Sequence, residues 1–177
     1  MAERSFADIS VDDLAKGAGL SRPAFYFYFP SKDAVLLTLW DRVIREADAA
    51  LEALADHQPS DRHDLWRPAI GVFFETFGAH RGVTVAAAGA SNTEVRDVFA
   101  TFMQKWIDFT AATIDAERKR GAAPNTLPAK DIATALNLMN ERTLLASFAG
   151  ERPGVPTDRV LDTIVHIWAT SIYGKMP

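Results

Sequence analysis

The chain has no cysteine among its 177 residues, and it has no long apolar run. Without cysteine there is no disulfide framework and no thiolate-ligated metal centre, and the composition suits a reducing compartment. A membrane-spanning helix needs roughly 20 consecutive apolar residues, and no stretch approaches that length. The first ten residues also lack the apolar core of a signal peptide. We therefore expect a soluble, cytoplasmic protein with no membrane partner.

Signatures of common catalytic sites are also missing. The sequence has no G-x-S-x-G elbow, no P-loop and no dinucleotide fingerprint. The histidines lack the helical i, i+4 spacing of metal ligands; they are His57, His63, His80 and His166. Glu141 could serve as a general base, but no nucleophile is evident near it, and a structural pair with Arg142 is the simpler interpretation. We expect no metal, no cofactor and no enzymatic activity.

What the sequence does contain is helical periodicity. No segment alternates in the manner of a surface strand, so the fold should be all-α. With 48% hydrophobic residues the chain can bury a substantial core.

Two short helices with a tight turn between them are predicted from Ser10 to Lys32. Ser10 and Asp13 have the spacing of a capping box, so the first helix should begin at Val11. Glycines at the end of that helix permit a sharp turn. Ser21 caps a second helix, with Pro23 in its first turn, and that helix must stop before Pro30. A helix, a glycine-containing turn and a second helix form the unit that enters the DNA major groove.

Positive charge is concentrated in this stretch. Between Leu14 and Lys32 there are three cations, Lys16, Arg22 and Lys32, and no acid, although the net charge of the chain is −4. Phosphate attraction depends on the local field, so this favours DNA contact. Any capped helix pair can look like this, and spacing alone leaves DNA binding and a purely structural helix pair equally open.

The residue types in this segment are more informative than their spacing. Asp12 to Leu39 resembles the DNA-binding head of TetR-family repressors, which has a helix, the pattern A-x-x-A-G-V-S, and an aromatic recognition helix ending in F-x-S-K-(E/D)-x-L. Further segments resemble one repressor of that family, and with the head they cover nearly the whole chain: 66–77, 101–107, 115–128 and 132–150. TetR-like heads normally carry a full helix before this pair. Residues 1–9 have room only for its end, so we expect that first helix to be missing.

The resemblance implies which residues contact operator DNA. Arg22 would reach a guanine edge or a phosphate, and Pro23 and Ala24 would make apolar contacts. Tyr26 and Tyr28 would touch phosphate or base, while Lys32 and the hydroxyl of Ser10 would fix the register on the backbone. Phe25 and Phe29 should be head core. The full expected set is Ser10, Ser21, Arg22, Pro23, Ala24, Tyr26, Phe27, Tyr28 and Lys32.

A helix sustained for six turns from Ser31 to about Ala55 connects this head to the rest of the chain. We therefore divide the chain into a DNA-binding domain, 1–45, and a ligand-binding and dimerisation domain, 46–177. Residues 57–63 should form a loop. Further helices are expected at 65–79, 83–90, 93–120, 132–150 and 158–173.

The last two helices are apolar nearly all round. Residues 132–150 contain only two charges, Glu141 and Arg142. A body of this size cannot hide both helices completely, so part of their surface should meet a second copy. We expect a homodimer formed through these helices, which is also the arrangement that the family uses.

A polar stripe on the first of these helices indicates a ligand site. Asn137, Asn140, Glu141 and Leu144 occupy i, i+3, i+4 and i+7, so two amides and a carboxylate share one face. Unpaired amides facing inward would cost ~1 to 3 kcal/mol each, and a ligand oxygen is one possible partner. Backbone or water partners, with the aromatic residues as ordinary core, are the alternative that the pattern alone favours.

The family resemblance favours the ligand site. It implies a cavity for an apolar small-molecule effector, with these candidate residues: Trp66, Ile70, Phe73, Phe77, Phe99, Met103, Trp106, Phe109, Thr110, Asn137, Asn140, Glu141, Leu144 and Trp168. Phe99 stands where the similar repressor has tryptophan and Phe109 where it has tyrosine.

These expectations combine into a homodimeric repressor that binds double-stranded operator DNA and is released by an apolar effector. An apolar ligand would shift the connecting helices and change the separation of the two heads. The rival hypothesis is an apolar-ligand-binding dimer that has lost DNA binding through the missing first helix.

Overall fold

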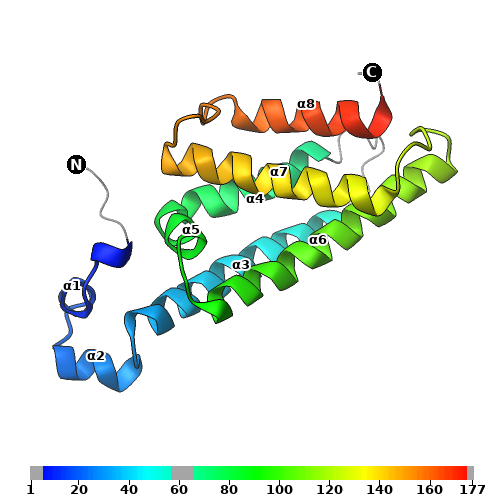
Figure 1. The fold of residues 1–177 in the computed structure, drawn as a ribbon. Helices are drawn as coiled ribbons and strands as arrows, with labels where there is room; N and C mark the ends of the chain where they lie inside the picture. Colours follow the sequence, from blue (N-terminus) through cyan, green and yellow to red (C-terminus); the bar gives the residue numbers. More distant parts are fainter. Residues whose placement is uncertain (1–5, 57–65, 175–177) are drawn as a thin grey trace.

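The computed structural model describes residues 6–56 and 66–174. Every regular element in these ranges is helical, which confirms the predicted all-α fold. Figure 1 shows a small head at one end of a long helix, α3 (Lys32–Asp56), and a helical body along the rest of it. The head consists of a 3-10 turn, η1 (Phe6–Asp8), followed by α1 (Val11–Gly17) and α2 (Arg22–Tyr28).

Local side-chain caps define the two head helices. Ser10 Oγ accepts a hydrogen bond from the backbone N–H of Asp13 at 3.1 Å, and the carboxylate of Asp13 accepts one from the backbone N–H of Ser10 at 2.9 Å. Ser21 Oγ caps α2 through the N–H of Ala24. The chain turns between the helices at Gly19, whose φ of 68° favours glycine. The predicted capping box and both predicted helix starts are confirmed.

The body helices are α4 (Trp66–Ala79), α5 (Arg81–Ala88), α6 (Thr93–Lys119), α7 (Ala129–Ala149) and α8 (Val160–Tyr173). α6 packs against α3 on one side and α7 on the other, and α8 covers α7 and α4 (Figure 1). α5 lies between α3 and α7, so it closes one end of the space that these helices enclose.

The predicted helix boundaries are close to those observed. α7 begins at Ala129, three residues before the predicted start at 132, because Pro128 occupies the N-cap position and its fixed φ suits a helix start. α8 begins at Val160, where the prediction had 158. The loop predicted at 57–63 lies outside the described residues.

The buried face of α3 joins the head to the body. Its buried apolar side chains are Leu36, Trp40, Val43, Ile44, Ala47 and Leu51, which follow the helical period. α3 packs through them against α4, α5 and α6. One continuous helix therefore links the head to the packing of α4, α5 and α6.

A buried polar cluster holds the ends of α4, α6 and α8 together. Trp66 Nε1 donates a hydrogen bond to the hydroxyl of Tyr173 at 3.1 Å. The Tyr173 hydroxyl is 3.4 Å from a carboxylate oxygen of Glu117, which is fully buried and accepts two hydrogen bonds from the guanidinium of Arg120. Burial raises the pKa of Tyr173. This cluster fixes the body at the end far from the head.

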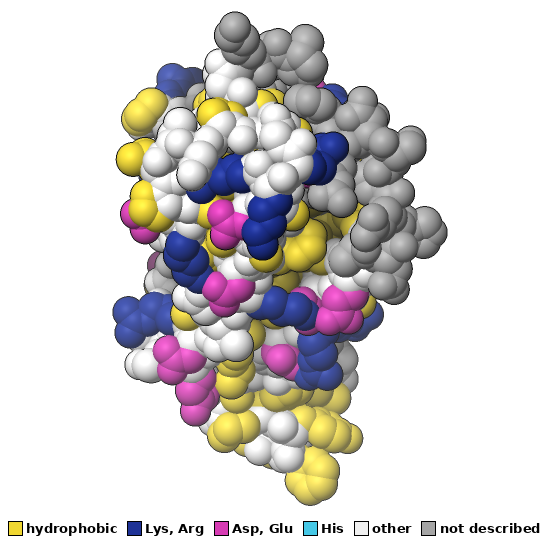
Figure 2. All heavy atoms as spheres, turned by 90° about the vertical axis from the view of Figure 1, so that its right-hand side faces the viewer, with side chains coloured by type: hydrophobic (Ala, Val, Ile, Leu, Met, Phe, Trp, Pro, Cys, Tyr) yellow, Lys and Arg dark blue, Asp and Glu magenta, His cyan; other side chains and the backbone are white. Residues whose placement is uncertain are grey.

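Charged and hydrophobic side chains gather on different parts of the surface. Figure 2 shows Lys and Arg interspersed with Asp and Glu over much of the visible face, whereas hydrophobic side chains gather at the lower end of the molecule, at the height of α2 in Figure 1. Among the residues that the structure describes, no helix is both long and apolar enough to cross a bilayer.

Candidate functional site

The outer face of α2 is aromatic and exposed. Phe27 is 83% exposed, and Tyr26 and Tyr28 are 45% and 63% exposed, whereas Phe25 is buried against Phe29. Large apolar surface in contact with water is unfavourable, and covering these rings with a partner would be favourable. On a short helix at the tip of the molecule, these rings are free to contact another surface.

Arg22 lies at the start of α2, beside these aromatic rings. Its side chain is 58% exposed, and its guanidinium lies 5.8 Å from the centre of the Tyr26 ring. It is not an isolated cation, because Asp12 in α1 forms an ion pair with it. The stretch without acids begins at Leu14, directly after Asp12 and Asp13, and the ion pair with Asp12 makes the local positive charge smaller than that stretch alone indicates.

Lys32 is engaged with the chain that precedes α1. Its ammonium donates hydrogen bonds to the carbonyl oxygens of Phe6, Ala7 and Ile9, each at 3.0 Å. An ammonium has three protons, so these bonds use its full donor capacity. The hydroxyl of Ser10 likewise donates to the carboxylate of Asp13 at 2.7 Å. In this conformation both groups hold the head together, and a phosphate contact requires them to exchange partners.

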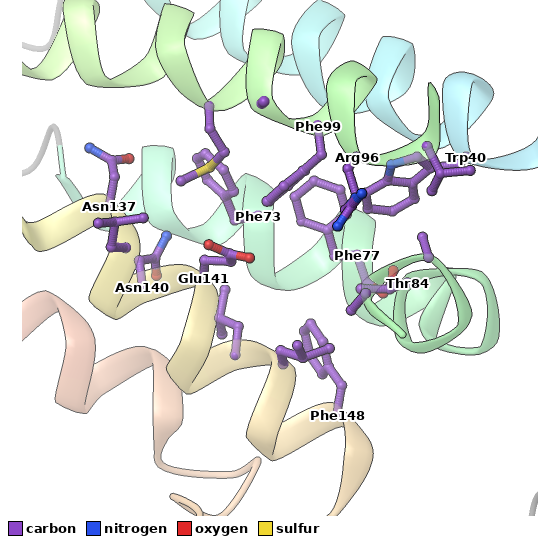
Figure 3. A pocket seen from close by; sticks show the side chains of 18 of the residues that line it. Trp40, Phe73, Phe77, Thr84, Arg96, Phe99, Asn137, Asn140, Glu141 and Phe148 are labelled. Atoms are coloured by element: carbon purple, nitrogen blue, oxygen red, sulfur yellow. The ribbon is translucent and has the colours of Figure 1, made fainter. Parts of the chain in front are cut away.

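A cavity of about 470 Å³ lies in the body between α3, α4, α5, α6 and α7. Its walls are mainly apolar and aromatic. The structure brings these predicted ligand residues to its lining: Phe73, Phe77, Phe99, Met103, Asn137, Asn140, Glu141 and Leu144. Figure 3 shows Asn137 and Arg96 toward opposite ends of this cavity, with Phe73 and Phe77 between them.

The other six predicted ligand residues lie outside the observed lining. Trp66 packs on Trp168, with 5.2 Å between ring centroids, beside the Tyr173 cluster. Trp106 packs between Phe73 and Phe109, so it supports the wall from behind. The residues expected to line the cavity but placed in the surrounding core are Trp66, Ile70, Trp106, Phe109, Thr110 and Trp168.

Sequence reasoning missed other lining residues, above all Trp40, Thr84, Arg96 and Phe148. Trp40 comes from α3 and contacts both Phe77 and Phe99, each at 5.7 Å between ring centroids. A signal for Arg96 was present, because Arg96, Phe99 and Met103 are spaced i, i+3 and i+7 on one face of α6. Nothing in the sequence indicated that α3 and α5 would meet that face.

The two asparagines of the polar stripe are buried and incompletely paired. Asn137 is 1% exposed, and its Nδ2 donates to Thr110 Oγ1 at 3.2 Å and to the carbonyl of Ala133 at 2.9 Å. Asn140 is 2% exposed. Among residues 6–56 and 66–174, no hydrogen-bond partner is found for the side-chain oxygens of both asparagines or for Nε1 of Trp40. Each such group costs about 1 to 3 kcal/mol when left unsatisfied.

Glu141 does not form the expected pair with Arg142. Arg142 forms its ion pair with Glu151, because the loop after α7 brings that carboxylate to the outer face of the helix. The carboxylate of Glu141 points from α7 into the cavity in Figure 3. Burial raises the pKa of Glu141, and the charge of Arg142 offsets this in part. The prediction of a Glu141–Arg142 structural pair was therefore wrong.

The histidines form no metal site in the described part of the chain. His80 Nε2 lies 3.1 Å from a carboxylate oxygen of Glu46. No group of three or more potential metal ligands occurs in residues 6–56 and 66–174. His57 and His63 lie outside the described residues.

Comparison with known proteins relates both halves of the chain to regulators. Residues 66–174 match the family "Transcriptional regulator EthR, C-terminal domain", and residues 1–39 match "Bacterial regulatory proteins, tetR family". The chain is 67% identical over 178 residues to the HTH-type transcriptional regulator EthR of Mycobacterium tuberculosis, covering 99% of this chain and 82% of that protein. It is 53% identical over 176 residues to EthR of Mycolicibacterium smegmatis, covering 98% of this chain and 81% of that protein.

A solved structure shows the same fold. The TetR-family repressor FadR of Thermus thermophilus, in complex with lauroyl-CoA, superimposes with a TM-score of 0.62 at 17% identity, covering 99% of this chain and 90% of that one.

Proposed function

The chain belongs to the TetR family of bacterial transcriptional regulators, with an EthR-type C-terminal domain, and from this membership we propose that it is a homodimeric repressor released from operator DNA by an apolar effector. Transcriptional regulation is not an enzymatic activity, so the site needs only to bind. In this proposal α2 reads the operator in the cytoplasm, and the cavity in the body receives the effector.

The observation that carries the proposal is the position of Trp40. This residue lines the cavity, yet it belongs to α3, the helix whose first turn adjoins the head. It lies eight positions after Lys32, which corresponds to about 12 Å along a helix. A ligand that displaces Trp40 therefore acts on the helix that carries the head. It changes DNA affinity only if it binds the displaced state better.

The head residues support DNA contact in specific ways. The exposed side chains at the start and along the outer face of α2 are placed to meet a groove: Arg22, Pro23, Tyr26, Phe27 and Tyr28. Ser21 caps the helix, and Ala24 is partly buried beneath it. An arginine in this position can reach a guanine edge or a phosphate after leaving Asp12.

Partly exposed apolar side chains on α8 support dimerisation. Val160, Ile164, Trp168 and Ile172 are buried, whereas Leu161, Val165, Ile167 and Ala169 are only partly buried. α8 lies on the outer side of α7 in Figure 1, and the part of these side chains that remains exposed would be covered by a second copy. A two-fold axis through α7 and α8 would form a four-helix interface and set two α2 helices side by side.

The test starts from duplex DNA of random sequence. The chain is incubated with the library, the bound fraction is sequenced, and the enriched duplex is titrated at several salt concentrations. A repressor enriches a near-palindrome with half-sites about 34–36 Å apart and shows a steep negative slope of log K against log salt. Sedimentation of the free protein should give a dimer, and Ile167→Asp should give monomers. No enrichment, or a monomer at all concentrations, would overturn the proposal.

A second function is favoured by one observation. The ammonium of Lys32 and the hydroxyl of Ser10 are both engaged within the head, so the two expected phosphate contacts are occupied. A ligand-binding dimer without DNA affinity would fit this state. It predicts ligand binding in the body with no enriched duplex in the same selection.

A further inference from the structure

Glu141 is the one acidic group in the observed lining of the cavity. Within the described residues, no hydrogen bond or ion pair engages its carboxylate, since the neighbouring Arg142 pairs with Glu151. A carboxylate that is partly removed from water without a partner is unfavourable. A cationic group placed beside it would offset that cost.

Aromatic rings line the same cavity as this carboxylate. Phe73, Phe77 and Phe99 line the cavity with Trp40, and Phe148 lines it from α7 (Figure 3). The face of an aromatic ring carries negative potential, so a cation near it is attracted, and more strongly where water is excluded. An acid among aromatic rings thus favours a cation over a neutral molecule of the same shape. The large apolar part of the wall requires the rest of that ligand to be apolar.

The other charged and polar side chains that line the cavity come from α5, α6 and α7. α6 contributes Arg96 and Gln104, both exposed, and α7 contributes the two asparagines. The lining residues from α3, α4 and α5 carry no charge. Because Arg96 reaches solvent, water and salt screen its charge. An anionic ligand at Arg96 would bring its charge into a cavity that already holds the carboxylate of Glu141.

We propose that the effector cavity selects an apolar amine, with its ammonium group beside Glu141 and its apolar portion against the rings of Phe73, Phe77 and Phe99. This assignment rests on the proposed function, because it names the chemical class of the effector. Burial raises the pKa of the Glu141 carboxyl. An adjacent ammonium lowers that pKa again, so binding of the amine is expected to strengthen as the pH rises toward neutrality.

Three octyl compounds of matched shape test the proposal: octylamine, octanamide and octanoate. Each is titrated into the full chain by calorimetry, with the fluorescence of the tryptophans as a second readout, since Trp40 lines the cavity. Octylamine should bind at least about tenfold more tightly than octanamide, a difference of one order of magnitude in Kd. Glu141→Gln should remove this preference, chiefly by weakening the binding of octylamine.

The control variant is Asp97→Asn, which removes the same charge from an exposed position on α6 outside the cavity lining. It should keep the preference for the amine. A persistent preference in Glu141→Gln would overturn the proposal. So would a preference for octanoate that disappears in Arg96→Gln, or binding of none of the three compounds.

These failures are separable from failure of the proposed function. If a neutral apolar compound releases the selected duplex while octylamine does not bind, the repressor assignment stands and the amine assignment is wrong. If no duplex is enriched but octylamine binds through Glu141, the amine assignment stands alone.

Discussion

Arg22 and Asp12 form an ion pair across the turn between α1 and α2, with 2.9 Å between Nη1 of the arginine and Oδ2 of the aspartate. Both side chains are more than half exposed. The charge of Asp12 raises the pKa of Arg22, so the guanidinium is a cation at neutral pH. The pair therefore affects where the guanidinium points, and it places a negative charge on the face proposed to meet DNA.

Asp12→Asn should strengthen DNA binding. It frees Arg22 and removes a charge that repels phosphate, and because solvent screens an exposed ion pair, the gain should be only a few-fold. The slope of log K against log salt should become steeper. Fluorescence anisotropy with the selected duplex measures both quantities. Asp97→Asn, the same charge change in the body, is the control, and an equal effect in the two variants would exclude a local role for Asp12.

Lys32→Met should loosen the segment before α1. The substitution leaves the carbonyl oxygens of Phe6, Ala7 and Ile9 without their shared donor, and hydrogen bonds to a charged group contribute about 1.5–3 kcal/mol. Hydrogen exchange of the amides in residues 6–10 should accelerate accordingly. Lys16→Met removes a cation from α1 that makes no such bonds and should leave this exchange unchanged. Unchanged exchange in Lys32→Met would mean that these bonds do not hold the segment.

Local chemistry made the head predictable from sequence. Ser10, Asp13 and Ser21 act on the backbone within three residues of themselves, so their spacing alone defines where α1 and α2 begin. The partners of Arg22 and Lys32 are ten or more residues away and depend on how the chain turns. The sequence identified these cations but could not indicate that their charges are used within the head.

The sequence indicated which residues of single helices would line the cavity, but it did not indicate how the helices would pack around it. The family resemblance pointed to eight of its lining residues, and each of them lies on the apolar or polar stripe of its own helix, α4, α6 or α7. How far each helix is rotated and slid against the next is a tertiary property. Trp66 and Trp168 face each other behind the cavity for that reason, and Trp40 faces into it.

The two asparagines of α7 should respond in opposite directions to replacement by leucine. Asn140→Leu removes a buried oxygen that has no partner, so the free energy of unfolding should rise by about 1 kcal/mol. Asn137→Leu removes a similar oxygen, but it also removes the hydrogen bonds to Thr110 and Ala133 and leaves the Thr110 hydroxyl without this donor, so the free energy of unfolding should fall by about 1 kcal/mol. Urea unfolding of the two variants gives the comparison, and shifts of the same sign would show that the pairing of Asn137 carries no stability.

Glu141→Gln should stabilise the protein at neutral pH, and the gain should disappear in acid. Burial raises the folded-state pKa of Glu141, so the folded state holds this proton more tightly than the unfolded state. The unfolded carboxyl ionises first as the pH rises through its ordinary pKa, and stability falls until the pH passes the raised pKa of the folded state. Below the ordinary pKa both states are protonated and the cost is absent, so the variant and the parent should then unfold alike.

Glu151→Gln is the control of opposite sign. The hydrogen bond from Arg142 lowers the pKa of Glu151 in the folded state. Its carboxylate therefore contributes stability above the ordinary pKa, and this contribution is lost as the pH falls. Urea unfolding across a pH series measures both trends. If the gain for Glu141→Gln were the same at every pH, the carboxyl of Glu141 would titrate alike in the folded and unfolded states. Its ionisation in the cavity would then carry no cost in stability.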